Sequence, residues 1–271
     1  MGIAELCCRF LSAMCLRHDV CQELVLSCGC VQGMMASLAE CLPSKGLAGA
    51  QRLSASIVSA IQQLVVRNKS AWVYVQMCSG IDGLLQLCQL GNTTIKNLCC
   101  STLMEEVSDW DKKLYGDDVT IKGGIEILYP LLSEKEDETT TISALRLIYT
   151  LSVNSPIFRK KSFSASGTAL FASILAVLRR SRDDSIRILV CRILSTFGAE
   201  NPSLLRRVLQ GEKESLSLLV RLSSETESPS LTAAAITSLA CMTVSDDADF
   251  PTGAPFLRQS LSTGGYLPSL R

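Results

Sequence analysis

Thiols are the most numerous side chains in this chain that could bind a metal or act as nucleophiles. The sequence has thirteen cysteines and a single histidine, His18. A structural zinc site needs four Cys or His ligands, usually in two closely spaced pairs. Cys28 and Cys30 are the nearest candidate pair, and no Cys-x-x-Cys pair accompanies them. Because free cysteine is among the most buried residue types and thiols stay reduced in the cytoplasm, we expect reduced core thiols in a cytoplasmic protein, with no metal and no cofactor.

Paired carboxylates are the second group that could carry chemistry. They occur at Asp117-Asp118, Asp183-Asp184 and Asp246-Asp247, where we expect turns between helices. Solvated helix caps explain carboxylates at such places. The chain has neither Gly-x-Gly-x-x-Gly nor Gly-x-x-x-x-Gly-Lys-Ser/Thr, the glycine motifs that hold phosphates. His18 stands in an expected turn, with no local nucleophile and base around it. We therefore expect no enzyme activity and no small-molecule substrate.

The charges sum to zero but are unevenly distributed. Residues 104–138 hold eleven acidic and four basic side chains, whereas residues 159–221 hold twelve basic and five acidic ones. A nucleic-acid-binding domain is more often basic throughout, so a nucleic-acid partner is not expected. The longest uncharged stretch, residues 228–245, contains Pro229 and seven Ser or Thr residues. It predicts a buried helix and no membrane span.

Short glycine turns recur along the chain, each just before an apolar helix. The glycines are Gly29, Gly80, Gly123-Gly124, Gly167 and Gly211, and successive turns lie 51, 43 or 44, 43 or 44, and 44 residues apart. Such a period is typical of helical repeat arrays, in which each unit covers its neighbours. Two helices that meet sharply need a residue without a side chain at the crossing, so we expect a steric reason for each glycine.

Long amphipathic helices precede these turns. In the clearest, Ile142, Leu145 and Ile148 recur at three-residue steps, and Leu151 continues the same face. Six helix ends align along the chain, at Met14, Leu64, Leu103, Leu151, Phe197 and Met242. An Asn that can end one helix or cap the next follows three of them, at Asn68, Asn154 and Asn201.

This order of short helix, glycine corner, medium helix, polar turn and long helix resembles the armadillo repeat. Residues 123–133 (GGIEILYPLLS) are similar to the second helix of that family, and residues 144–152 (ALRLIYTLS) to the third. The resemblance implies an all-α fold, a right-handed α-solenoid of about six armadillo-like (ARM/HEAT) three-helix repeats in a single array over residues 1–271. HEAT repeats, which lack the separate short helix, are the nearest alternative.

The same resemblance suggests where the units divide. They are expected at residues 17–67, 68–107, 119–154, 155–200 and 201–245, with partial units at 1–16 and 254–271. Internal repeats need neighbours on both sides, so we expect either a segment of a longer array or irregular caps.

In armadillo proteins the long third helices line a concave groove. Peptide-binding members carry an Asn ladder there, with Trp one turn earlier, that clamps an extended partner. The Asn positions fall here on Gln63, Thr102, Thr150, Thr196 and Cys241. The Trp positions fall on Ser59, Leu98, Arg146, Arg192 and Thr237. Because the ladder is absent, recognition of basic localisation signals in the manner of importin-α is not expected.

Two arginines stand at groove positions instead. Arg146 and Arg192 are 46 residues apart, which is about one repeat. Together with Thr150 and Thr196, they are expected to form a partner-binding groove in which the planar guanidinium groups bind carboxylates of an acidic protein segment. Alternatively, each arginine only covers its own helix with a solvated stem.

One connection between units is longer than the others. Residues Leu103 to Gly123 span 20 residues, whereas the corresponding connections elsewhere take 14 to 16. The excess contains Trp110 and Tyr115 among charged residues. Insertions in solenoids form loops that often lie on a binding face. Trp110 and Tyr115 are therefore a candidate insertion-loop contact, or a Trp folded back on the preceding helix.

Together these patterns favour a non-catalytic protein-interaction scaffold or adaptor that binds a partner segment in its groove. The alternative is a structural subunit of a large cytoskeletal, flagellar or other multiprotein assembly. A permanent subunit should expose large apolar patches outside the groove, and a transient adaptor should concentrate them within it.

Overall fold

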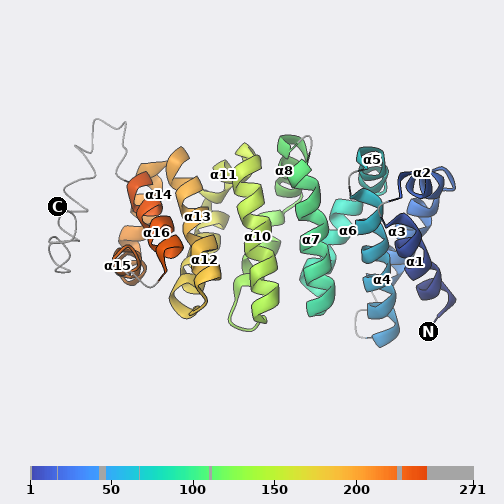
Figure 1. Cartoon of the computed structure of the whole chain (residues 1–271), viewed down its shortest axis with the longest axis horizontal. Helices are drawn as coiled ribbons and strands as arrows, with labels where there is room; N and C mark the ends of the chain where they lie inside the picture. The colour runs from blue at the N-terminus through green and yellow to red at the C-terminus, as the bar shows by residue number, and fades with distance from the viewer. Residues whose placement is uncertain are drawn as a thin grey trace. The chain divides into compact units, whose positions relative to one another are not determined.

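All regular elements in the described part of the chain are helical. A computed structural model describes residues 2–16, 18–42, 47–66, 68–109, 112–224 and 228–242. The helices follow one another as short, medium and long, the order predicted from the sequence (Figure 1). The predicted all-α solenoid is thus confirmed, whereas the division into repeat units stays a prediction.

The helices fall into three sets by their place in this order. The short helices are α2 (Asp19–Ser27), α5 (Lys69–Met77), α8 (Lys112–Ile121), α11 (Pro156–Ser162) and α14 (Pro202–Gly211). The medium ones are α3 (Cys30–Cys41), α6 (Gly80–Leu90), α9 (Gly124–Leu128) with the 3-10 helix η2 (Tyr129–Leu132), α12 (Ala165–Arg180) and α15 (Lys213–Leu222). The long ones are α1 (Ile3–Cys15), α4 (Ala48–Val65), α7 (Thr93–Asp109), α10 (Glu138–Asn154), α13 (Asp184–Glu200) and α16 (Pro229–Cys241).

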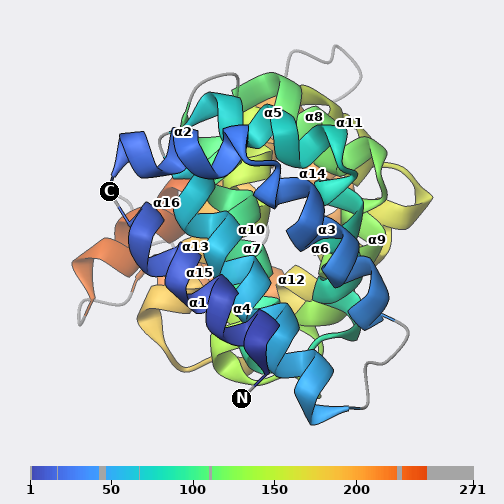
Figure 2. The same ribbon diagram turned by 90° about the vertical axis from the view of Figure 1, so that its right-hand side faces the viewer.

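The chain divides into two compact units, Met1–Phe158 and Arg159–Arg271. In the first unit the long helices α1, α4, α7 and α10 pack side by side in that order, and α3, α6 and α9 form a second row. Viewed from the end of this unit, α1 lies in front of α4 (Figure 2). In the second unit α13 packs against α16, and α12 against α15.

The core of each unit comes from the periodic apolar positions. In α10, Leu145, Ile148 and Leu151 are completely buried, as their spacing predicts, whereas Ile142 is partly exposed. In the second unit three phenylalanines from three segments form an aromatic cluster, with ring centroids 4.9 to 5.6 Å apart: Phe163, Phe171 and Phe197. Burial of such faces is the main source of stability for helices of this length.

Three of the five predicted glycine corners have the expected geometry, and all three lie in the first unit. Gly29 (φ +70°) and Gly123 (φ +86°) are left-handed, and Ser79 takes the same conformation (φ +57°) at the second corner. A Cβ on Gly80 would lie 2.6 Å from the Val75 carbonyl oxygen, which explains the glycine there. Close helix crossing therefore explains Gly80, and also Gly124, where a Cβ would lie 2.7 Å from the Val119 carbonyl oxygen, whereas the left-handed backbone explains Gly29 and Gly123.

The prediction of a steric role is wrong at Gly211. This residue ends α14, and a Cβ there would meet nothing within 4 Å. Gly167 lies inside α12 and does not form a separate corner. In the second unit the chain passes from short to medium helix through Ser164 and Glu212, both outside the left-handed region.

The long connection after Leu103 is mostly helical. Helix α7 continues to Asp109, and α8 takes up residues 112–121. Tyr115 is buried (5% exposed) and packs edge-on against Trp72, with ring centroids 6.1 Å apart. The prediction of an exposed loop contact is therefore wrong for Tyr115, and Trp110 lies outside the described residues.

Polar residues at the starts of the short helices act as caps. The side chains of Asn68 and Asn201 accept hydrogen bonds from backbone N–H groups three residues ahead, as predicted. At the corresponding place before α11 the cap is Ser155, because Asn154 still belongs to α10. His18 caps α2 in the same way, through Nδ1.

None of the described helices is by itself long and apolar enough to cross a membrane. By length and composition alone, α2 and α3 pass such a test as a pair, and they are bent by 70° at the glycine corner between them.

Candidate functional site

The long helices of the first unit carry a row of polar contacts between neighbours. The hydroxyls of Ser12 and Ser59 lie 3.3 Å apart and join α1 to α4. The amide of Gln62 donates to the hydroxyl of Ser101 over 3.1 Å and joins α4 to α7. Asn97 of α7 donates to the hydroxyl of Thr139 of α10 over 3.0 Å, and Lys96 of α7 forms an ion pair (2.5 Å) with Glu136 in the turn before α10. These contacts fix the spacing of the long helices on which a groove would be built.

A hollow of about 420 Å³ opens between α1 and α4. Its walls are short side chains: Ser12, Ala13, Ala55, Ser56 and Ser59. Gln63 and Arg9 add an amide and a guanidinium, and Leu16 adds one large apolar side chain. Ser59 and Gln63, which the sequence predicted at the Trp and Asn positions of a peptide-binding ladder, both line this hollow.

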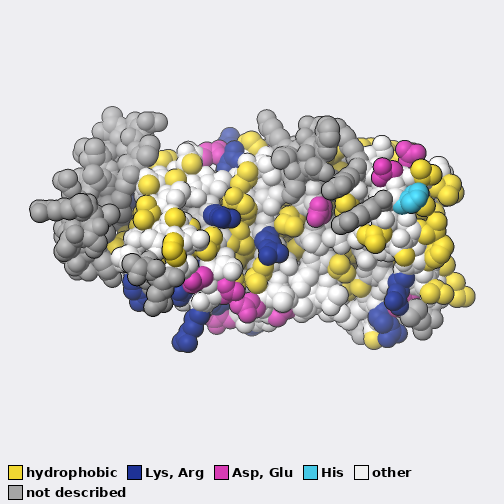
Figure 3. Space-filling view, in the orientation of Figure 1, with side chains coloured by type: hydrophobic (Ala, Val, Ile, Leu, Met, Phe, Trp, Pro, Cys, Tyr) yellow, Lys and Arg dark blue, Asp and Glu magenta, His cyan; other side chains and the backbone are white. Residues whose placement is uncertain are grey.

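Figure 3 shows only a few separate Lys and Arg side chains in the middle of this face, and Asp and Glu side chains that gather along its lower edge. Arg146, on α10, and Arg192, on α13, are both exposed, and neither guanidinium has an ion-pair partner among the described residues. Arg146 belongs to the first unit and Arg192 to the second. Each presents free donors to the solvent from the position that the sequence predicted.

Thr150 and Thr196 lie one turn after these arginines and make the same contact. Each hydroxyl donates to the backbone carbonyl of the arginine four residues earlier, over 2.9 Å. Thr102 makes the equivalent bond to the carbonyl of Leu98 over 2.8 Å, but it is buried. Because their protons are used within the helix, Thr150 and Thr196 can offer a partner only acceptor oxygens.

Much of the other basic charge of residues 159–221 is already engaged. Arg159 forms an ion pair with Glu200, and Arg179 with Glu212. The guanidinium of Arg206 is buried and donates to the carbonyl of Met242 over 2.5 Å. These arginines hold helices of the second unit together, which sets Arg192 apart from them.

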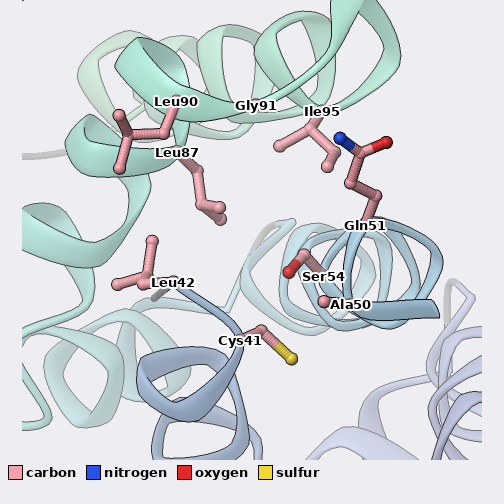
Figure 4. Close-up of a pocket in the computed structure, with 9 residues that line it drawn as sticks. All are labelled: Cys41, Leu42, Ala50, Gln51, Ser54, Leu87, Leu90, Gly91 and Ile95. Carbon is pink, nitrogen blue, oxygen red and sulfur yellow. The ribbon is translucent and has the colours of Figure 1, made fainter. Parts of the chain in front are cut away.

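A second, smaller pocket lies among α3, α4, α6 and α7 and measures only about 20 Å³ (Figure 4). Its walls are mostly apolar, and Gln51 and Ser54 are the polar side chains that line it. A cavity of this size holds about one water molecule. It is therefore too small for a side chain of a partner protein.

The thiols do not form a reactive or metal-binding centre among the described residues. All thirteen are free, and no group of three or more His, Cys, Asp or Glu side chains there could hold a metal ion. Cys88 and Cys100 are buried with their sulfurs 3.9 Å apart. Burial raises the pKa of the Cys191 thiol to about 11. Because the thiolate is the nucleophile, such a raised pKa makes this cysteine inert.

Two buried polar residues were not predicted as important. Gln22 donates to the carbonyls of Cys15 (3.1 Å) and Gln63 (3.0 Å), at the ends of α1 and α4. Its oxygen accepts a hydrogen bond from Asn68, the cap of α5. The sequence shows Gln22 as one polar residue in a short helix, and only its partners 41 and 46 residues away reveal its role.

Asp117 is the second such residue, and the prediction that it lies in a solvated turn is wrong. It lies within α8, is buried, and accepts hydrogen bonds from the hydroxyl of Ser155 (2.5 Å) and the N–H of Ile157 (3.3 Å). The equivalent prediction holds for Asp183, whose side chain caps α13.

No protein-family model and no curated protein matches this sequence. Several solved structures do share its fold. A designed armadillo repeat protein aligns with a TM-score of 0.68 at 12% identity, covering 88% of this chain and 92% of that chain. A second, solved in complex with the peptide (KR)4, aligns with a TM-score of 0.69 at 14% identity, covering 87% and 91%. A computationally designed armadillo repeat protein for modular peptide recognition gives 0.69 at 13% identity, covering 86% and 91%. The helix order, the glycine corners of the first unit and these alignments establish that the chain has the armadillo repeat fold.

Proposed function

We propose that this chain is a non-catalytic protein-interaction scaffold or adaptor that binds a partner segment on its long-helix face. The observation that carries the proposal is the hollow between α1 and α4, which includes the ladder positions Ser59 and Gln63. In the related designed protein a peptide is bound to the same kind of fold. The cytoplasm is the proposed location, because thirteen free thiols are compatible with a reducing compartment.

The partner segment that fits this face is acidic. The designed protein was solved with (KR)4, a basic peptide. Here Arg146 and Arg192 take the place of neutral ladder residues, and like charges on a partner would be repelled. A guanidinium can donate two parallel hydrogen bonds to one carboxylate, which gives both energy and orientation. Removing the arginine from such a charged hydrogen bond typically costs about 1.5–3 kcal/mol of binding free energy.

The hollow adds a second requirement on the partner. Five short side chains leave space that a Phe, Leu or Trp of a bound segment would fill, and such buried anchors supply most of the energy at protein interfaces. Gln63 can bond to the backbone of the segment beside the anchor. The proposed ligand is therefore an extended acidic segment with one bulky apolar side chain.

The test is a titration with labelled peptides by fluorescence anisotropy. An acidic peptide with a central Phe should bind, and (KR)4 should not. The double variant Arg146→Glu/Arg192→Glu should abolish binding with an unchanged melting temperature. Arg182→Glu/Arg207→Glu makes the same change in net charge at two exposed arginines off the long-helix face and should retain binding. Equal loss in both double variants would mean that only net charge matters, which contradicts a specific groove.

A second candidate function is favoured by a separate observation. Large exposed apolar side chains lie on α1, α2 and α5 as well as near the groove. Among the described residues of these three helices, six expose more than half of their surface: Ile3, Leu6, Phe10, Val20, Leu24 and Met77. Such surfaces favour a permanent structural subunit of a multiprotein assembly, cytoskeletal and flagellar ones included. A subunit of that kind should aggregate when purified alone, whereas an adaptor should stay monodisperse or form a defined oligomer.

A further inference from the structure

The hollow between α1 and α4 has a different chemistry at each of its two ends. On α1 its lining runs from Arg9 to Leu16, a distance of about 10 Å along the helix. The guanidinium of Arg9 stands at one end, and the exposed Leu16 side chain stands at the other. A partner side chain that fills the hollow must therefore be long, and it must carry a polar group at the end that reaches Arg9.

The contacts between α1 and α4 determine which residues face each other across the hollow. The hydroxyls of Ser12 and Ser59 are hydrogen-bonded, and the carboxylate of Glu5 pairs with Arg52. Both pairs are 47 residues apart in the sequence. The same offset gives two further pairs that line the hollow: Arg9 with Ser56, and Leu16 with Gln63. One end thus offers a cation and a hydroxyl, and the other end offers an apolar side chain and an amide.

The polar end of the hollow favours an anion. Among the described residues that line it, Arg9 is the one cation and none is a carboxylate. Glu5, the one acidic residue of α1, lies outside the lining, and its carboxylate is 3.8 Å from Nε of Arg52. A guanidinium has five N–H donors, so Arg9 can bind an anion and still keep a bond within the chain. An anionic group at this end therefore gains charge-assisted hydrogen bonds, whereas a cation would be repelled.

We propose that the partner segment inserts a tyrosine into this hollow and that phosphorylation of the tyrosine strengthens binding. This tyrosine is the anchor that the proposed function requires, so its role rests on that function. Phosphotyrosine combines an aromatic ring with a phosphate that has three acceptor oxygens and a charge of about −1.5 to −2 at neutral pH. Phe, Leu and Trp lack the anion, and Asp and Glu are shorter and lack the ring.

The three parts of a phosphotyrosine match three parts of the hollow. Its backbone lies beside Gln63, whose amide can bond to it. Its ring packs between Ala13 and Ala55, where the short side chains leave room. Its phosphate reaches the guanidinium of Arg9 and the hydroxyl of Ser56. Unphosphorylated tyrosine occupies the same place without the charge, so a kinase and a phosphatase that act on the partner raise and lower its affinity.

The test compares three acidic peptides that are identical except for a central Phe, Tyr or phosphotyrosine. Fluorescence anisotropy at constant ionic strength gives the dissociation constant of each. The phosphotyrosine peptide should bind wild type at least about tenfold more tightly than the Phe peptide, as expected for added charge-assisted hydrogen bonds. A fourth peptide, with a central Phe and a terminal phosphoserine, carries the same charge and should bind like the Phe peptide.

Single substitutions in the protein locate the phosphate and the ring. Arg9→Gln should remove the advantage of phosphotyrosine and keep binding of the Phe peptide, with an unchanged melting temperature because Arg9 is exposed. Arg52→Gln is the matched control and should keep the advantage, since Arg52 is an exposed arginine on α4 that does not line the hollow. Ala13→Leu fills the hollow from an exposed position and should weaken binding of all four peptides.

The possible outcomes distinguish the tyrosine anchor from the proposed function as a whole. If the Phe peptide binds and phosphotyrosine adds nothing, the tyrosine anchor is overturned and the proposed function stands. The same follows if Arg9→Gln keeps the advantage of phosphotyrosine, or if the terminal phosphoserine gives an equal gain, because net charge alone would then explain the effect. If none of the four peptides binds, the proposed function is overturned and the tyrosine anchor with it.

Discussion

Replacing Gly80 by Ala should destabilise the first unit because it disturbs the corner between α5 and α6. The added Cβ would lie 2.6 Å from the carbonyl oxygen of Val75 and 3.1 Å from its carbonyl carbon. These are backbone atoms, so a rotamer change of one side chain cannot relieve the contact. The two helices would have to move apart by several tenths of an ångström, and the apolar contacts that they share would loosen.

The size of the effect follows from two opposing terms. Overpacking of this kind costs about 1–3 kcal/mol. Ala in place of Gly restricts the unfolded chain and returns about 0.4–1 kcal/mol. The net loss is therefore roughly 1–2 kcal/mol, which for a domain of this size lowers the melting temperature by about 2–8 °C.

Gly211→Ala is the matched control for this measurement. A Cβ on Gly211 meets nothing within 4 Å, and the residue lies in the helical region at the end of α14. Only the restriction of the unfolded chain by Ala then applies, so the free energy of unfolding should stay unchanged or rise. Urea denaturation followed by circular dichroism gives both values. Equal effects of the two substitutions would refute the steric account of the glycine corners.

Three further outcomes follow from the structure. Gln22→Ala should lower the free energy of unfolding by about 2–4 kcal/mol, because the carbonyls of Cys15 and Gln63 lose their buried donor. A loss below 1 kcal/mol in urea titration would argue against the role of Gln22 in joining the ends of α1 and α4. Hydrogen bonds from Thr139 and Thr93 lower the pKa of Asp137, which caps α10. Its contribution of about 0.5–2 kcal/mol should thus be present at neutral pH and decline as the pH falls below about 4, so the stability gap between wild type and Asp137→Ala should narrow in acid. Iodoacetamide at pH 8 should label Cys7 in the native chain and leave the buried Cys191 unmodified; mass spectrometry after digestion distinguishes the two.

The helix order was predictable because it depends on short-range patterns. Apolar residues at three- and four-residue steps and glycines at a nearly constant period are visible in the sequence itself. The conformation of each glycine was less predictable. Ser79 is left-handed although it has a side chain, and Gly211 is helical although it has none. The backbone angle at a corner depends on how closely the two helices pack, and residue type alone does not determine that.

Long-range contacts explain the errors around α8. Charged residues are dense between residues 104 and 118, and that density favoured a solvated loop. Tyr115 is nevertheless buried against Trp72, 43 residues earlier, and Asp117 is buried against Ser155, 38 residues later. The Asp117 carboxylate would be costly to bury without its distant hydrogen-bond partner, and neither Trp72 nor Ser155 is marked as a partner in the local sequence.

The candidate groove was predictable in part. The positions of Arg146 and Arg192 came from the repeat register, and the structure places both on exposed helix surfaces. The hollow was not foreseen, because it forms between two helices whose small residues lie about 50 positions apart in the chain. The absence of Trp at position 59 indicated only that the family's ladder was missing. In the folded chain the small Ser59 side chain at that position lines the hollow between α1 and α4.

The proposed groove can be tested most directly by hydrogen–deuterium exchange with and without the acidic peptide that carries a central Phe. The account predicts that the peptide slows exchange in α1 and α4, around the hollow, and in α10 and α13, around Arg146 and Arg192. The short helices α2 and α5 should exchange as before. Protection confined to α2 and α5, or no protection at a peptide concentration that saturates binding, would contradict the long-helix face as the binding site.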